Sequence, residues 1–92
     1  TYNFAGKTIL ITGGAGDIGR ATARRFAANG ASVALLDLNE AKMVDVAREL
    51  AEYKVPVATF GCDVTIPENV AKAFAGAVEQ LGRIDYVFNN AG

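Results

Sequence analysis

The hydrophobic residues of the chain form two kinds of pattern that alternate along its length. Four short, nearly continuous hydrophobic runs are typical of buried strands and occupy residues 7–12, 32–36, 56–62 and 85–88. Between them, hydrophobic residues recur every three or four positions, which predicts helices with one buried face at residues 17–29, 39–51 and 65–81. This alternation predicts a parallel sheet with helices packed on its faces.

Right-handed crossovers between the strands leave few arrangements for such a sheet. We expect an α/β domain of three layers, α/β/α, in which residues 1–92 form the first half of a doubly wound parallel sheet with strand order 3-2-1-4. The chain shows no internal repeat or linker. The fourth strand would be an unprotected edge, so we expect the chain to be part of a longer one; the alternative is a self-contained four-stranded domain.

Local signals predict where the helices begin and end. Gly30 and Gly82 should end the first and third helices, and Asn39 should cap the second. Thr65 and Glu68 have the spacing of a capping box, with a proline in the first turn. The predicted buried stripes are Met43, Ala47, Leu50 and Ala51 in the second helix, and Val70, Phe74, Ala77, Val78 and Leu81 in the third. Tyr86 is expected to pack against a helix.

The turn after the first predicted strand is rich in glycine. Gly14, Gly16 and Gly19 satisfy the spacing G-x-G-x-x-G, with a strand before them and a helix after them. Glycines let the backbone approach a ligand closely, and the following helix offers unpaired N–H groups to a pyrophosphate. This context predicts a Rossmann-type dinucleotide site, although such a turn can also be purely structural. The chain has no G-K-[ST] sequence, which disfavours a nucleoside triphosphatase.

Asp37 stands at the end of the second predicted strand. A carboxylate at that place can accept hydrogen bonds from both hydroxyls of the adenosine ribose, and it would repel a 2′-phosphate. Leu38 follows it, where a cation would be needed to bind that phosphate. The predicted cofactor is therefore NAD rather than NADP. The alternative is that Asp37 only caps the second helix, beside Asn39.

The composition excludes several other classes of function. The 9 basic and 10 acidic residues are well mixed, so we expect neither nucleic-acid nor membrane binding, and no hydrophobic run is long enough to cross a bilayer. The chain has no histidine and a single serine, which rules out Ser-His or Cys-His catalysis and histidine-based metal sites within it. Cys62 is the only cysteine and is expected to be an inert thiol, in keeping with a cytoplasmic location.

Taken together, the landmarks of the chain resemble the short-chain dehydrogenase/reductase family in its single-domain branch. They are T-G-G-A-G-D-I-G at 12–19, Asp37, Asp63-Val64, and N-N-A-G at 89–92. The family pattern T-G-x-x-x-G-x-G is met by Thr12, Gly13 and Gly19, but Asp17 stands where the family has its middle glycine. We expect the Asp17 carboxylate to accept N–H bonds of the first helix rather than face the phosphates.

The resemblance implies a set of cofactor contacts. The pyrophosphate and adenosine ribose would lie on Gly13, Gly16, Asp17 and Ile18, largely through backbone groups. Gly19 would pack the helix onto the strand. Asp63 would reach the adenine amino group and the Val64 N–H the adenine ring, while Asn90, with Ala91 and Gly92, would pass beneath the cofactor ribose and tie the fourth strand to its neighbours. For residues 63–65, the alternative to an adenine contact is a plain strand end followed by a Thr65 helix cap. For Asn89-Asn90, the alternative to a cofactor contact is an ordinary turn.

The family's chemistry rests on a tyrosine and lysine spaced Y-x-x-x-K, with a serine and an asparagine, and this spacing does not occur in the 92 residues. No catalytic residue is therefore predicted here. The resemblance implies an NAD(H)-dependent oxidoreductase that transfers hydride between nicotinamide and a secondary alcohol or ketone of polyol, steroid or 3-oxoacyl type. It also implies a homo-oligomer, a dimer or tetramer, with contacts beyond residue 92. The alternatives are a non-catalytic nucleotide sensor and an S-adenosylmethionine methyltransferase.

Overall fold

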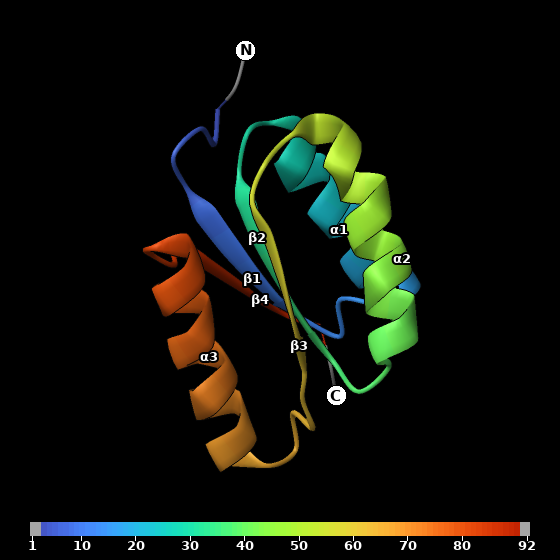
Figure 1. Cartoon of the computed structure of the whole chain (residues 1–92), viewed down its shortest axis with the longest axis vertical. Coiled ribbons are helices and arrows are strands. Elements are labelled where there is room, and N and C mark those ends of the chain that lie inside the picture. Colours follow the sequence, from blue (N-terminus) through green and yellow to red (C-terminus); the bar gives the residue numbers. More distant parts are fainter. Residues whose placement is uncertain (1–2, 91–92) are drawn as a thin grey trace.

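The computed structural model describes residues 3–90, which form one parallel sheet flanked by helices (Figure 1). The elements in chain order are β1 Thr8–Thr12, α1 Asp17–Ala28, β2 Ser32–Asp37, α2 Glu40–Leu50, a 3-10 turn Ala51–Tyr53, β3 Val57–Gly61, α3 Pro67–Leu81 and β4 Tyr86–Asn89. The strand order is β3-β2-β1-β4, and all neighbours are parallel. The predicted fold and strand order are confirmed.

Helices cover both faces of the sheet: α1 and α2 lie on one face and α3 on the other (Figure 1). Successive residues of a strand point to opposite faces, so Ile9 and Ile11 of β1 pack with α1 and α2, whereas Leu10 packs with α3. All five residues of β1 are buried for this reason. The edge strands β3 and β4 keep exposed positions, because each has a neighbour on one side only within residues 3–90.

The helix boundaries agree with most of the local signals. Gly30 and Gly82 adopt positive φ angles of 92° and 86°, and the Asn39 side chain accepts a hydrogen bond from the Lys42 N–H at 3.0 Å. The predicted capping box is wrong. Helix α3 has Ile66 at its N-cap with no side-chain cap bond, because the Thr65 hydroxyl donates to Asp63 instead.

The predicted helix stripes were partly displaced. In α2 the buried residues are Met43, Val46 and Leu50, and Ala51 is exposed. In α3, Ala73 and Ala77 are buried, while Phe74 and Val78 are 41% and 38% exposed. Several adjacent positions of a helix are hydrophobic here, so spacing alone did not decide which of them meets the sheet.

The start of β4 is held to β1 by Asp85. Its carboxylate accepts the Thr8 N–H at 2.8 Å, and Arg83 donates to the same carboxylate at 2.6–3.0 Å. The bond from Arg83, together with that from Thr8 and the positive charge of Lys7, lowers the pKa of Asp85. One position further along, Tyr86 packs with the Phe26 ring of α1 at a centroid distance of 5.8 Å, as predicted.

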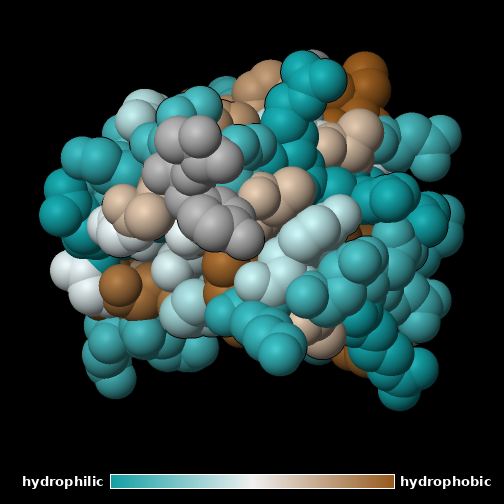
Figure 2. All heavy atoms as spheres, turned by 90° about the horizontal axis from the view of Figure 1, so that it is seen from above, coloured by the Kyte–Doolittle hydropathy of each residue, from teal (hydrophilic) through white to brown (hydrophobic). Residues whose placement is uncertain are grey.

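The end of the molecule at which the strands begin is mainly hydrophilic, with hydrophobic residues in small separate patches (Figure 2). Within residues 3–90, no helix combines the length and hydrophobicity needed to cross a membrane. The groups with predicted chemistry lie at the other end of the sheet.

Candidate nucleotide-binding site

The carboxyl ends of the four described strands meet at one edge of the sheet, because the strands are parallel (Figure 1). This edge brings together the glycine turn after β1, Asp37 at the end of β2, Asp63 after β3 and Asn90 after β4. The sequence predicts that these four places form one site, and the fold makes them neighbours.

The glycine turn is anchored to the end of β2. Gly13 has a positive φ of 69°, and its N–H donates to the Leu36 carbonyl at 2.7 Å. The Gly14 N–H donates to the same carbonyl at 3.2 Å. The Gly16 N–H then donates back to the Gly13 carbonyl at 3.1 Å, so the turn closes on itself just before α1 begins.

Two of the remaining glycines are required by packing. A Cβ on Gly19 would collide with the Gly13 carbonyl oxygen and lie 3.0 Å from the Gly14 Cα. A Cβ on Gly14 would lie 2.8 Å from the side chain of Leu35. Gly19 therefore lets α1 lie close against the glycine turn, and Gly14 lets the turn lie close against β2.

Packing does not explain Gly16. Its φ of −79° is open to any residue, and a Cβ there would make only an ordinary contact, 3.5 Å from the Gly13 carbonyl oxygen. Gly16 is exposed at the start of α1, and within residues 3–90 the N–H groups of Asp17, Ile18 and Gly19 donate to no acceptor. A bare backbone beside unpaired helix N–H groups fits a phosphate ligand.

Asp17 does not adopt the predicted geometry. Its carboxylate accepts no N–H bond from the described part of α1, and the residue is exposed. It borders a shallow hollow between α1 and α2, together with Arg20 and Lys42. Each of the first N–H groups of the helix points along the axis, so a carboxylate at the first helical position is poorly placed to accept them; this role belongs to the preceding N-cap residue, which is Gly16 here.

The Asp37 carboxylate joins two segments of the site. Oδ2 accepts the Ala15 N–H of the glycine turn at 3.0 Å, and Oδ1 accepts the Asn39 N–H at 2.9 Å. Asp37 therefore lies on the same side of the sheet as the glycine turn. The side-chain cap of α2 comes from Asn39, so capping does not account for Asp37.

Asp63 is held by a single neighbour. Its Oδ1 accepts both the Thr65 N–H at 2.9 Å and the Thr65 hydroxyl at 2.6 Å. These two bonds, the hydroxyl bond first, lower the pKa of Asp63. The second oxygen, Oδ2, accepts no hydrogen bond within residues 3–90. It is available to a donor such as an amino group.

A hollow of about 180 Å³ lies between the ends of β2 and β3. It is lined by Gly13, Asp37, Leu38, Cys62, Asp63, Val64 and Thr65. Leu38 is 70% exposed beside it, and Ile18 is 64% exposed at the glycine turn; these are the highest exposures among the large hydrophobic side chains that the structure describes. Exposed aliphatic groups next to bare backbone fit the faces of a flat ligand.

The Cys62 thiol borders this hollow but is only 5% exposed. Burial, and secondarily the negative charge of Asp63, raises its pKa. The thiol therefore stays protonated at neutral pH, which agrees with the inert role expected for it.

The end of β4 is tied to the glycine turn through Thr12. The Thr12 hydroxyl donates to the Asn89 side chain at 2.8 Å and accepts the Asn90 N–H at 3.0 Å. The Asn90 amide also donates to the Gly13 carbonyl, at 3.4 Å. Asn90 thus links the fourth strand to the first, and Asn89-Asn90 is more than an ordinary turn. The predicted contacts of Ala91 and Gly92 lie outside the described residues.

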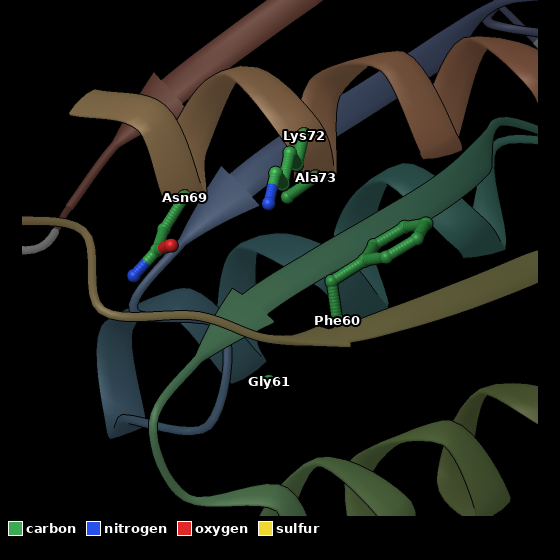
Figure 3. Close-up of a pocket in the computed structure, with 5 residues that line it drawn as sticks. All are labelled: Phe60, Gly61, Asn69, Lys72 and Ala73. Carbon is green, nitrogen blue, oxygen red and sulfur yellow. The ribbon is translucent and has the colours of Figure 1, made fainter. Parts of the chain in front are cut away.

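A second hollow, of about 270 Å³, lies between α3 and β3 (Figure 3). Asn69 and Lys72 extend from α3, and Phe60 extends from β3, around this hollow. Its lining includes no residue of the glycine turn and neither carboxylate of the site, so it is separate from the site at the strand ends.

Three features of the site were missed by sequence reasoning. Thr65 orients Asp63 rather than capping a helix, Leu38 forms an exposed wall, and Thr12 joins two strand ends. The D-x-T spacing at 63–65 is a signal for the first, because aspartate side chains bond the backbone two residues on. The other two depend on neighbours from different elements.

Comparison with known proteins agrees with this geometry. The model of the short chain dehydrogenase family matches residues 7–92. The chain is 40% identical over 88 residues to 3beta-hydroxysteroid dehydrogenase 2 of Eggerthella lenta, covering 96% of this chain and 34% of that protein. It is 46% identical over 83 residues to 3-hydroxyacyl-CoA dehydrogenase type-2 of Drosophila melanogaster, covering 90% and 31%.

Solved structures give the same result. The structure of NAD+-bound xylitol dehydrogenase superimposes with a TM-score of 0.94 at 41% identity, covering 98% of this chain and 35% of that one. Carveol dehydrogenase from Mycobacterium avium in complex with NAD gives 0.95 at 30% identity, covering 100% and 38%. The chain belongs to the short-chain dehydrogenase family. It spans about a third of the length of these relatives.

Proposed function

We propose that this chain binds NAD(H) and forms the cofactor-binding part of an oxidoreductase acting on a secondary alcohol or ketone. One observation carries the proposal: an exposed glycine without a packing role and unpaired helix N–H groups lie beside a carboxylate that is held to the same turn. The bound nicotinamide would supply or accept the hydride. The proposed substrate is a polyol, a steroid or a 3-oxoacyl compound.

Each part of the cofactor has a group suited to it. The pyrophosphate would lie on the backbone of Gly16 and the N–H groups of Asp17 and Ile18. The ribose diol would donate to Asp37. The adenine would enter the 180 Å³ hollow beside Leu38 and Val64, with its amino group donating to the open oxygen of Asp63. Asn90 would lie beneath the second ribose.

The charge of Asp37 favours NAD over NADP. A 2′-phosphate would replace a hydrogen-bond donor by a dianion next to this carboxylate, and the neighbouring Leu38 offers no cation. We expect the protein to act on a small-molecule substrate and to assemble as a homo-oligomer through surfaces outside residues 1–92. Membership of the family removes the methyltransferase alternative.

The direct test is a fluorescence titration of the purified protein with NADH and NADPH. We expect NADH to bind at least about tenfold more tightly, the effect of about one charge-assisted interaction. Equal or tighter binding of NADPH would contradict the role of Asp37. Turnover of an alcohol or ketone would exclude the sensor alternative, whereas its absence would not favour it, because no catalytic residue is predicted among these 92 residues.

A matched pair of variants tests the glycine argument. Gly16→Ala should keep the melting temperature within a few degrees, because its Cβ has room, but should weaken NADH about tenfold or more by blocking the phosphate. Gly19→Ala should instead lower the melting temperature, because its Cβ collides with backbone. Unchanged NADH affinity in Gly16→Ala would count against the phosphate site.

A further inference from the structure

We infer that Asp37 is also a positioning residue, which holds the glycine turn in its binding conformation before the cofactor arrives. The inference rests on the proposed NAD site and adds a second role to one of its residues. It follows from the bond between Asp37 Oδ2 and the Ala15 N–H, which joins the end of β2 to the middle of the turn at 3.0 Å.

The carboxylate has the capacity for both roles. Two carboxylate oxygens offer about four acceptor positions. Ala15 and Asn39 use one position on each oxygen, which leaves one on each for the two hydroxyls of a ribose. Binding the diol therefore does not require the turn to be released.

The turn needs such support because of its composition. Glycine loses more backbone freedom on ordering than any other residue, and this turn contains Gly13, Gly14 and Gly16. The Leu36 carbonyl anchors the N–H groups of Gly13 and Gly14, and Asp37 anchors the next one, that of Ala15. The three consecutive N–H groups together fix the path of the chain into α1, where the phosphate would bind.

A prediction separates the two roles. If Asp37 only accepts hydrogen bonds from the ribose diol, then its removal should not weaken the binding of an NADH analogue that lacks both hydroxyls of the adenosine ribose. If Asp37 also supports the turn, its removal should weaken the binding of that analogue too. Loss of a negative charge near the pyrophosphate would act in the opposite direction, so a decrease in affinity identifies the support.

The experiment compares the wild-type protein with Asp37→Asn, which has nearly the same shape but presents an N–H₂ group in place of one acceptor oxygen. We expect the variant to bind the dideoxy analogue about tenfold more weakly, as for one charge-assisted hydrogen bond. The affinity for NADH should fall by a larger factor, since NADH also loses a hydrogen bond from its ribose diol. An unchanged or increased affinity for the analogue would overturn the inference.

A second measurement needs no ligand. Amide exchange in the cofactor-free protein, followed by NMR, should be faster at Ala15 in Asp37→Asn, while the buried Leu35 amide in β2 stays protected and shows an intact fold. Asp63→Asn is the matched control, because Asp63 makes no bond to the turn. Unchanged exchange at Ala15 would overturn the inference. Failure of the NAD proposal is distinguishable, because then neither nucleotide binds the wild-type protein.

Discussion

The ends of β2 and β3 carry the same local arrangement, yet they differ in what it connects. At each end an aspartate accepts the N–H of the residue two positions on: Asn39 donates to Asp37, and Thr65 donates to Asp63. The second oxygen of Asp37 reaches across to the glycine turn, whereas that of Asp63 has no partner within residues 3–90. Position in the sheet explains the difference, because β2 is the strand next to β1 and its turn.

Under the proposed function, the same local arrangement would serve two different roles. An aspartate on a strand adjacent to the glycine turn can support the turn and read the ribose. Asp63, one strand further out, is held only by its own segment, and in the proposed site it would contact the adenine rather than the ribose. The variants below should separate these roles.

The largest effect is expected for Asp37→Ser, which removes the charge and shortens the side chain. NADH should bind at least about a hundredfold more weakly, because two charge-assisted hydrogen bonds of about 1.5 kcal/mol each are lost in addition to the bond that supports the glycine turn. NADPH should lose much less, because repulsion of its 2′-phosphate disappears. Titration with both cofactors measures the change in their ratio; an unaltered ratio would disprove the discrimination role of Asp37.

A smaller effect is expected for Asp63→Asn. The amide oxygen can still accept the two Thr65 bonds, but the open oxygen becomes a donor that faces the adenine amino group. NADH and NADPH should both weaken about tenfold, since their adenine rings are identical. The ratio of the two dissociation constants is the control, and a change in that ratio would place Asp63 near the ribose instead.

A still smaller effect is expected for Thr65→Val, which removes the hydroxyl but keeps the backbone bond. Asp63 should become less well oriented, and NADH affinity should fall about threefold, as for part of a neutral hydrogen bond. Thr65→Ser keeps the hydroxyl and is the matched control. If serine and valine weaken binding equally, the Thr65 methyl rather than its hydroxyl matters.

Thr65→Val and Thr65→Ser should also differ in the pKa of the Asp63 carboxyl. In the wild-type protein the Thr65 bonds hold the Asp63 pKa below its ordinary value. The bonds to the carboxylate therefore persist at mildly acidic pH and are lost only as the pH falls through this lowered pKa. In Thr65→Val the pKa should rise toward the ordinary value, and in Thr65→Ser it should not. NMR titration of the Asp63 carboxyl carbon measures both; equal values in all three proteins would contradict the hydroxyl bond.

Most of the fold was predictable from the sequence, because strict alternation of strands and helices with right-handed crossovers leaves few strand orders. The predicted helix ends at Gly30 and Gly82 and the Asn39 cap are confirmed, because each of these signals acts within a few residues of its own position. The errors concern choices among equivalent neighbours. The Thr65 hydroxyl could either cap α3 or bond to Asp63, and it bonds to Asp63. The hydrophobic side of α3 is wider than the part of the helix that packs on the sheet.

The sequence by itself determined which residues stand at the carboxyl ends of the strands, because hydrophobic spacing and turn residues act locally. Only the tertiary structure decided that Asp37 reaches Ala15, that Asp17 accepts no bond from the helix N–H groups, and that Gly16 has no packing role. These features depend on distances between atoms of different elements. Such distances arise from the packing of α1 and β2 against β1, and no local pattern encodes them.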